Sequence, residues 1–509
     1  MPALTRREFA GAAAAGALVR ARDAAAAEDP TALSLAEAAR RIRERTATPT
    51  GLTQACLARI EAYDGKLNAF ITVVRDQALA QARTLDAEQK AGRLRGALHG
   101  VPIALKDLID TAGVRTTAAS RLLQDRAPAE DAAVVQRLKA AGAVIVGKTN
   151  LQEFAYGAGE LSAFGPARNP WALDRGTGGS SSGSGAAVAA GLCFGALGTD
   201  TAGSVRQPAS FCGIVGLKPT YGLVSIRGIL PLMPSLDHCG PMTRTVEDAA
   251  LMLDQLAGYD PLDPTSVQPP PARYLEAMRR PVSGLRLGLP EGYFDDLDPE
   301  VAEAVGRAVA LLSDMTRGAK PVRLPPAAAF AVGGPLGAEA LTFHAALLKE
   351  KPDDYLPPIR RRIEAQQRWS AADYARTRFD LQLLRRAIDG AFTDVDLVVM
   401  PTERGLSQRL EDMIARSMGT APAPAVPPAP SNIAPFDAYG IPAISVPCGF
   451  SRSGLPIGLM IAGPHFSDGR VLALAGAYEA AAGWKNRRPP LSPDTPAPPV
   501  GGYTWMSSR

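Results

Sequence analysis

The spacing of apolar and polar positions changes along the chain. Between residues 31 and 90, apolar residues recur every three to four positions, so that Leu35, Ala38 and Ile42 share one side while Arg and Glu occupy the other. This spacing predicts an N-terminal helical segment over residues 28–90. After about residue 95, short apolar runs typical of buried strands alternate with stretches of helical spacing.

Five short apolar runs are the strand candidates: Val101–Leu105, Ala143–Val146, Ile214–Leu217, Leu397–Met400 and Ala443–Val446. Between the first two, residues 131–141 place apolar side chains at helical spacing, and Ala186–Ala190 is a second helical run. The order strand, helix, strand predicts an α/β fold, with a mixed, mostly parallel β-sheet core covered by helices on both faces.

The remaining boundaries follow from composition. Residues 91–485 are expected to form one domain, in which residues 270–395 are mostly helical and charged. A Pro-rich loop spans Pro422–Pro435, and residues 486–509 form a Pro-rich C-terminal tail.

The first 27 residues have the pattern of an export signal. Twin arginines, Arg6 and Arg7, precede the weakly apolar run Ala10–Val19, and Ala24–Ala26 follows as a small-residue cleavage site. This order predicts a signal of the twin-arginine type, cleaved near Ala26-Ala27, and a periplasmic or secreted protein. An Ala-rich N-terminal helix with surface arginines is the alternative.

Composition and charge exclude several classes of protein. Of 509 residues, 46% are hydrophobic and 21% are charged, which is typical of a globular chain and not of a disordered one. A net charge of only +4 argues against a nucleic-acid binder. No stretch after the signal reaches 18 uninterrupted apolar residues, so no stable membrane span is expected. The five cysteines are scattered, and their pairing state is left open.

Two short motifs match known patterns in the wrong context. Gly142–Thr149 has the letters of a phosphate-binding loop, but its variable residues Ala143–Val146 are themselves a strand candidate and cannot wrap around a phosphate. Gly179–Gly183 matches the GxSxG elbow, yet a polar loop and not a buried strand precedes it. None of the four histidines is an obvious triad partner, and no Cys/His cluster exists, so neither a metal nor another cofactor is expected.

A longer series of motifs is specific. The segments that carry it are His99–Asp107 (HGVPIALKD), Gly178–Gly185 (GGSSSGSG), Gly198–Ala209 (GTDTAGSVRQPA), Phe211–Thr220, Gly240–Asp248, Gly440–Pro447 and Gly454–Gly458. Together they closely resemble the amidase signature family of serine hydrolases. The resemblance covers most of the chain outside the signal and the tail, and it weakens over residues 270–395. It implies that residues 91–485 are the catalytic domain and that the variable insertion 270–395 shapes the substrate pocket.

The resemblance implies the family's fold and a Ser-cisSer-Lys triad. It places the nucleophile on Ser204, the bridging serine on Ser180 behind a cis Gly179–Ser180 peptide, and the base on Lys106. It also implies that the oxyanion is bound by the backbone amides of Thr201, Ala202, Gly203 and Ser204, with support from Ser181, Asp200 and Arg206.

Lys106 must be neutral to act as a base. An ordinary lysine has a pKa near ~10.4, so the pKa must fall by about 3 for the amine to be neutral near pH 7 to 8. Burial alone can supply a decrease of that size. Lys106 ends the apolar run Val101–Leu105, so it can lie at the end of a buried strand.

The sequence therefore predicts an amidase that hydrolyses the C–N bond of a linear carboxamide through a seryl acyl-enzyme, releasing ammonia or an amine. The partners expected are a small-molecule amide and the twin-arginine export machinery, with no nucleic acid and a homodimer left open. A glutaminase-type subunit of a tRNA-dependent amidotransferase, an esterase and an inactive binding protein on the same scaffold are the alternatives. Asp437 stands where relatives often carry asparagine and Met460 where some carry glutamine, and both differences can alter specificity.

Overall fold

The computed structural model describes residues 29–157, 159–421 and 430–501, so the expected export signal lies outside the described residues. The strands are β1 (Phe70–Val73), β2 (Pro102–Lys106), β3 (Val144–Thr149), β4 (Gly195–Asp200), β5 (Val215–Lys218), β6 (His238–Thr243), β7 (Leu287–Pro290), β8 (Ala319–Val322), β9 (Leu397–Pro401), β10 (Ala443–Phe450) and β11 (Pro456–Ala462). Within these ranges the eleven strands form one sheet in the order β1-β3-β2-β4-β6-β5-β10-β11-β9-β7-β8.

The sheet is mixed, as expected, but it is not mostly parallel. Strand β2 pairs in parallel with β3 and β4, and β7 pairs in parallel with β8 and β9. The other six pairings among the described strands are antiparallel. An apolar run predicts a strand without its direction. For example, β10 and β11 are joined by only the five residues 451–455, which allows antiparallel pairing alone.

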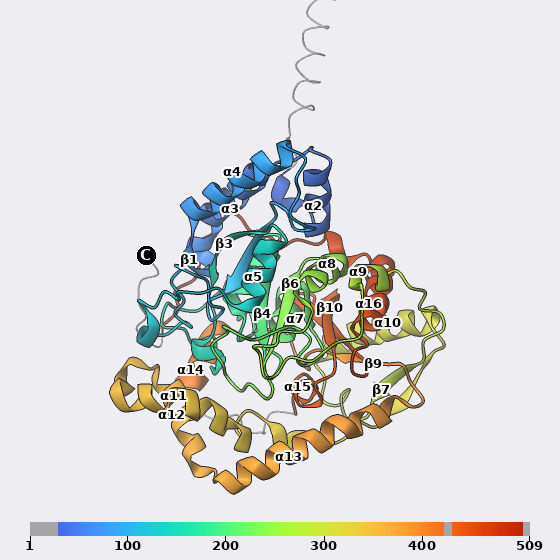
Figure 1. Cartoon of the computed structure of the whole chain (residues 1–509). Helices are drawn as coiled ribbons and strands as arrows, with labels where there is room; N and C mark the ends of the chain where they lie inside the picture. The colour runs from blue at the N-terminus through green and yellow to red at the C-terminus, as the bar shows by residue number, and fades with distance from the viewer. Residues whose placement is uncertain (1–28, 158, 422–429, 502–509) are drawn as a thin grey trace, which may run out of the picture.

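Helices flank the sheet (Figure 1). They are α2 (Leu35–Arg43), α3 (Pro49–Leu67), α4 (Arg75–Lys90), α5 (Ala133–Ala140), α6 (Ser182–Ala189), α7 (Arg206–Cys212), α8 (Val246–Leu256), α9 (Tyr274–Ala277), α10 (Pro299–Met315), α11 (Ala338–Glu350), α12 (Pro357–Glu364), α13 (Ala371–Ala387), α14 (Leu410–Met418), α15 (Pro435–Tyr439) and α16 (Asp468–Ala482). Helix α2 begins where the Ser34 side chain accepts a hydrogen bond from Glu37 N, and arginine side chains fill its last turn.

Both segments expected to be helical also add strands to the sheet. The N-terminal segment supplies β1, which pairs antiparallel with β3 at one edge of the sheet. The segment 270–395 supplies β7 and β8 at the other edge. Helices α11, α12 and α13 from that segment form an outer layer along the lower rim of Figure 1.

The parallel strands determine where the candidate site lies. Because β2, β3 and β4 run in the same direction, their carboxyl ends lie side by side, and these ends carry Lys106, Thr149 and Asp200. Helix α6 packs against these strands, and all of its residues are buried. A Cβ on Gly183 would lie 2.3 Å from Ala69 O and 2.5 Å from Asn150 N, so only glycine allows that approach.

Candidate active site

Lys106 is fully buried at the end of β2. Its Nζ lies 2.7 Å from Ser180 Oγ and 2.8 Å from Thr199 Oγ1. Burial lowers the pKa of Lys106 to about 7, although the nearby Asp200 and Asp237 carboxylates favour the ammonium form. An amine with this pKa is a competent base near neutral pH.

Ser180 follows a cis peptide bond between Gly179 and Ser180. Its carbonyl accepts a hydrogen bond from Gln152 N at 3.2 Å. The Gly179 amide donates to Gln207 Oε1 at 3.1 Å. The bridging serine is therefore held from both sides, by the segment after β3 and by α7, with its Oγ directed at Lys106.

Ser204 lies in the loop between β4 and α7 and is partly exposed, whereas Lys106 and Ser180 are buried. Its carbonyl accepts a hydrogen bond from Ser181 N at 3.2 Å. The hydrogen bonds found in the described residues include none between Ser204 Oγ and Ser180 Oγ. The loop lies next to the segment that carries Ser180 and Ser181, and the Ser204–Ser180 contact of the expected triad is not made in this structure.

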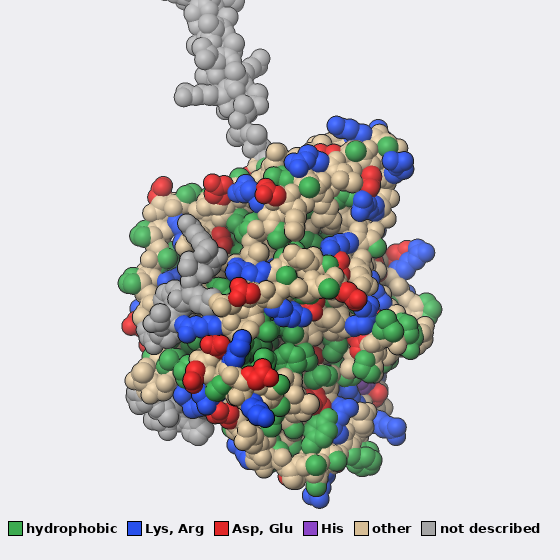
Figure 2. All heavy atoms as spheres, turned by 60° about the vertical axis from the view of Figure 1, so that its left-hand side comes forward, with side chains coloured by type: hydrophobic (Ala, Val, Ile, Leu, Met, Phe, Trp, Pro, Cys, Tyr) green, Lys and Arg blue, Asp and Glu red, His purple; other side chains and the backbone are tan. Residues whose placement is uncertain are grey.

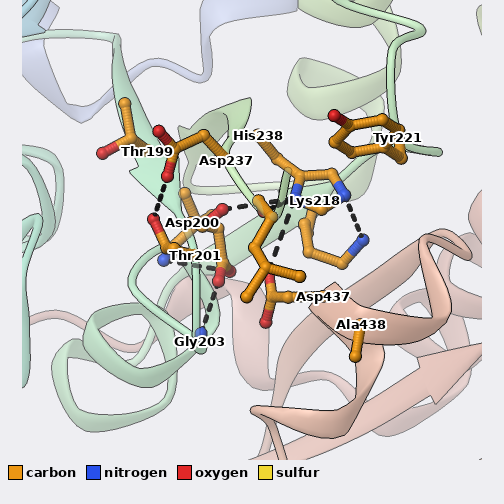
Figure 3. Close-up of polar contacts among 12 residues, drawn as sticks. Thr199, Asp200, Thr201, Gly203, Lys218, Tyr221, Asp237, His238, Asp437 and Ala438 are labelled. Carbon is orange, nitrogen blue, oxygen red and sulfur yellow. Dashed lines mark hydrogen bonds and ion pairs between the residues drawn. The ribbon is translucent and has the colours of Figure 1, made fainter. Parts of the chain in front are cut away.

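Residues 201–205, between β4 and α7, are called the nucleophile loop after the role predicted for Ser204, and Asp200 holds this loop. Its Oδ1 accepts from Gly203 N at 2.5 Å, and its Oδ2 accepts from Val205 N at 3.1 Å. Arg206 adds hydrogen bonds of 3.0 and 3.1 Å to the two oxygens. Burial alone would raise the pKa of Asp200, but the Arg206 guanidinium holds it well below its usual range. The Gly203 amide thus differs from the expectation for an oxyanion hole, because it is occupied by Asp200 (Figure 3).

The other three amides of the predicted oxyanion hole differ from that of Gly203. Those of Thr201, Ala202 and Ser204 donate to no acceptor among the described residues. Gly203 has φ +110°, and a Cβ there would lie 2.1 Å from Ile433 Cδ1, so glycine is required for the turn even though its amide faces away.

Ser181 ties the nucleophile loop to β4. Its Oγ donates to Thr199 O and accepts from Thr199 N, both at 3.2 Å. Asp237 restrains the same loop from another direction: its Oδ1 accepts from Thr201 Oγ1 at 2.6 Å (Figure 3). Thr199, Asp237 and Gln207 were not predicted from the sequence. Thr199 could have been found, because it directly precedes Asp200 within the same motif.

A second buried cluster lies behind the loop (Figure 3). Arg206 Nη2 donates to Asp437 Oδ2 at 2.7 Å, and His238 Nδ1 lies 3.4 Å from Asp437 Oδ1. Burial and the neighbouring Asp200 raise the pKa of Asp437. Burial, assisted by Lys218, lowers the pKa of His238 well below its usual value. Asp437 therefore supports Arg206 and does not face the Lys106–Ser180 pair.

Lys218 completes this cluster. Its Nζ donates to Ile441 O at 2.7 Å and to Pro219 O at 3.2 Å, and it lies 3.1 Å from His238 Nε2. Burial lowers the pKa of Lys218 to about 7, while Asp437 favours the ammonium form. A second buried lysine thus lies near the loop, in surroundings quite unlike those of Lys106.

A basic cavity of about 1000 Å³ lies beside the segment that leads to Ser180. Arg175, Arg362, Arg409 and Arg416 line it together with the single carboxylate of Asp412. The excess of positive charge favours binding of anionic groups there. Figure 2 shows Lys and Arg side chains interspersed with Asp and Glu over the face that it presents.

Within the described ranges, no group of three or more His, Cys, Asp or Glu side chains could hold a metal ion. The five cysteines are all free, which settles their pairing state, and burial raises the pKa of the Cys193 thiol to about 12. No helix in the part of the chain that the structure describes is long and apolar enough to span a bilayer. Strand β3 runs through Val144–Thr149, so the segment that resembles a phosphate-binding loop is extended.

The chain is similar to known amidases and amidotransferase subunits over most of its length. The family model described as "Amidase" matches residues 51–472. The A subunit of the glutamyl-tRNA(Gln) amidotransferase of Moorella thermoacetica is 41% identical over 466 residues, which cover 86% of this chain and 94% of that protein. The peptide amidase of Stenotrophomonas maltophilia has 33% identity and a TM-score of 0.79, covering 91% and 99% of the two chains. The A subunit of the amidotransferase of Thermotoga maritima has 34% identity and a TM-score of 0.71, covering 89% and 96%.

Proposed function

The chain belongs to the amidase family, and from this premise we propose that it hydrolyses the C–N bond of a linear carboxamide through an acyl-enzyme on Ser204. The observation that carries the proposal is the buried Lys106 amine, 2.7 Å from Ser180 Oγ and with its pKa lowered to about 7. Such an amine can accept the proton of a serine, which histidine does in other hydrolases.

We propose the following course for the reaction. Neutral Lys106 takes the proton of Ser180, Ser180 takes that of Ser204, and Ser204 Oγ attacks the carbonyl carbon. The amides of Thr201, Ala202 and Ser204 bind the oxyanion. The proton returns through Ser180 to the leaving nitrogen, the C–N bond breaks, and ammonia or an amine departs. Water then cleaves the acyl-serine ester, with Lys106 again as base, and the carboxylic acid leaves.

A second candidate is favoured by the comparisons: a glutaminase-type subunit of a tRNA-dependent amidotransferase. The curated relatives at 38–41% identity are A subunits of glutamyl-tRNA(Gln) amidotransferases. The basic cavity, which can bind a carboxylate, is compatible with glutamine as the amide donor. In that role the chain would need further subunits in the cytoplasm, which conflicts with an export signal.

The cellular location of the protein distinguishes the independent amidase from the amidotransferase subunit. We propose that residues 1–27 are a twin-arginine signal, so that the mature protein acts outside the cytoplasm. With both Arg6 and Arg7 replaced by lysine, uncleaved precursor should accumulate inside the cell. Unchanged secretion of that variant would overturn the twin-arginine proposal, whereas retention of the unprocessed wild-type protein in the cytoplasm would strengthen the amidotransferase alternative.

The direct test is ammonia release by the purified protein from a panel of aliphatic, aromatic and peptide amides and from glutamine, with Ser204→Ala as control. We expect hydrolysis of at least one amide without partner subunits, no effect of EDTA, and labelling of Ser204 by a fluorophosphonate. Ammonia release from glutamine alone would favour the amidotransferase role. Hydrolysis of esters but not amides would make the enzyme an esterase, and absence of both turnover and labelling would leave an inactive binding protein.

A further inference from the structure

A short chain of hydrogen bonds links Glu403, through Gln207, to the residue before Ser180. Gln207 lies in the first turn of α7, three positions after Ser204, and the side chains of Ser204, Gln207 and Glu403 are all partly exposed. Gln207 Nε2 donates to Glu403 Oε1 at 3.0 Å, and Gln207 Oε1 accepts from the amide of Gly179, the residue before Ser180, at 3.1 Å. Glu403 is therefore connected by two hydrogen bonds to Gly179, the residue before Ser180, and its direct partner Gln207 follows Ser204 by three positions.

The sheet fixes the position of Glu403. The residue follows the end of β9, where Thr402 Oγ1 and Ser445 Oγ, both buried, form a hydrogen bond of 2.9 Å. Pro401, the last residue of β9, accepts a hydrogen bond at its carbonyl oxygen from Asn432 Nδ2 at 3.0 Å. A carboxylate held in this way offers a fixed point for a substrate group.

Glu403 has no cation of its own. Within the described ranges, no Lys or Arg nitrogen lies within 4.0 Å of its carboxylate, and its Oε2 has no hydrogen-bond partner. The nearby Arg206 is turned to Asp200 and Asp437. Arg404 donates to the carbonyls of Gly292, Asp295 and Pro430.

This missing cation indicates what Glu403 binds. Burial raises the pKa of Glu403 to about 7, so the group is ionised in mildly alkaline solution. A half-buried carboxylate without a counter-ion is costly, and a ligand that supplies a positive charge with N–H donors removes that cost.

We propose that Glu403 is a specificity-determining residue that binds a protonated amine on the acyl part of the substrate. The substrate class is then the carboxamides of amino acids and other short amino acids with an unmodified amine. This inference rests on the proposed acyl-enzyme function. The basic cavity lined by Arg175 and Arg362 is separate, so the two regions can recognise opposite charges on one substrate.

The test compares pairs of fluorophosphonates that differ only at the end of the alkyl chain, which carries either an ammonium or a methyl group, in three chain lengths at pH 8.5. The quantity measured is the ratio of the two rates of Ser204 labelling within one protein, so any general change in Ser204 reactivity cancels. We expect the wild type to favour the ammonium probe by about 10-fold at its best chain length, and Glu403→Gln to bring the ratio close to 1. The amide oxygen of the Glu403→Gln side chain can still accept the hydrogen bond of Gln207, so the local fold should survive.

Two further variants sharpen the result. Glu403→Asp withdraws the carboxylate by one methylene, so the preferred probe should become one methylene longer. Glu411→Gln, which removes an exposed carboxylate on α14, should keep the wild-type ratio.

Equal rates with all pairs in the wild type, or an unchanged preference in Glu403→Gln, would overturn the inference and leave the proposed function intact. Failure of both probes to label Ser204 at any length would instead count against the proposed function.

Discussion

Two of the buried lysines, Lys106 and Lys218, lie near the nucleophile loop, and their partners differ. Both Lys106 and Lys218 are fully buried, and burial lowers the pKa of each to about 7. Lys106 contacts two hydroxyl groups, on Ser180 and Thr199. Lys218 contacts two carbonyl oxygens and the His238 ring. Burial and pKa therefore do not distinguish a base from a structural lysine in this protein.

The partners make the distinction. A hydroxyl can donate or accept, so Ser180 can give its proton to a neutral Lys106. The Lys218 partners can only accept. His238 Nδ1 lies 2.6 Å from Leu236 O, which assigns the ring proton to Nδ1 and leaves the Nε2 lone pair facing Lys218. Three acceptors need three N–H donors. An ammonium group has three, whereas a neutral amine has only two. Lys106 is thus arranged to exchange a proton, and Lys218 is arranged to keep one.

The largest expected effect comes from removing the base. Lys106→Met should slow fluorophosphonate labelling of Ser204 by about 10²–10⁴, the usual contribution of a positioned general base. Its stability should fall less than that of Lys218→Met, because the Ser180 and Thr199 hydroxyls lose a partner but the variant no longer buries a titratable amine. The rate and the denaturant midpoint are measured on the same preparation. A loss of rate that only parallels a loss of folded protein would contradict the assignment.

Lys218→Met should show the reverse pattern. It leaves two carbonyls and one imidazole nitrogen buried without a donor, at about 1–3 kcal/mol each, so the free energy of unfolding should fall by about 3 kcal/mol or more. The folded fraction should lose less labelling rate than Lys106→Met does. Denaturant unfolding measures the first quantity and labelling below the unfolding transition the second. A stable Lys218→Met with the same rate loss as Lys106→Met would remove the difference between the two lysines.

The smallest effect is expected at Thr199. Thr199→Val removes one of the two hydroxyls that hold Lys106, while Ser180 still contacts the amine, so labelling should slow by about 10-fold. Thr199→Ser keeps the hydroxyl and should restore most of the rate. If Thr199→Ser is as slow as Thr199→Val, packing of the threonine methyl and not its hydrogen bond is responsible.

The sequence predicted the strands that carry the site better than the contacts within it. Strands β2 and β3 lie within three residues of the apolar runs that predicted them, because buried parallel strands are continuously apolar. The strand β4 was missed, because its sequence, Gly195–Asp200, contains too few apolar residues to stand out. Whether the sheet is mostly parallel depends on the directions of β4 and β6. These directions are set by pairing with strands distant in the sequence, so a local sequence pattern does not predict them.

The site residues Lys106, Ser180 and Ser204 were found only through the family resemblance. Their proximity depends on three parallel strands ending at one edge of the sheet, which spacing along the chain does not reveal. The same holds for the Gly203 amide: its sequence position suggested an oxyanion-hole donor, but a bond to Asp200 three residues earlier occupies it. Glu403 carries no local signal, and only the fold places it against Gln207.

The pH dependence of Ser204 labelling tests the central claim most directly. Below its pKa Lys106 is an ammonium and cannot accept a proton, so the rate should rise through pH 7 and level off above it. Glu403 also has a pKa raised to about 7, so its titration could produce the same rise in rate. The Glu403→Gln variant, which removes that titration, must therefore keep the rise. Lys106→Met and Lys106→Arg should lose it between about pH 5 and 10, since arginine stays protonated throughout. A rise through pH 7 that persists in both Lys106 variants would contradict the account, because the base would then be another residue.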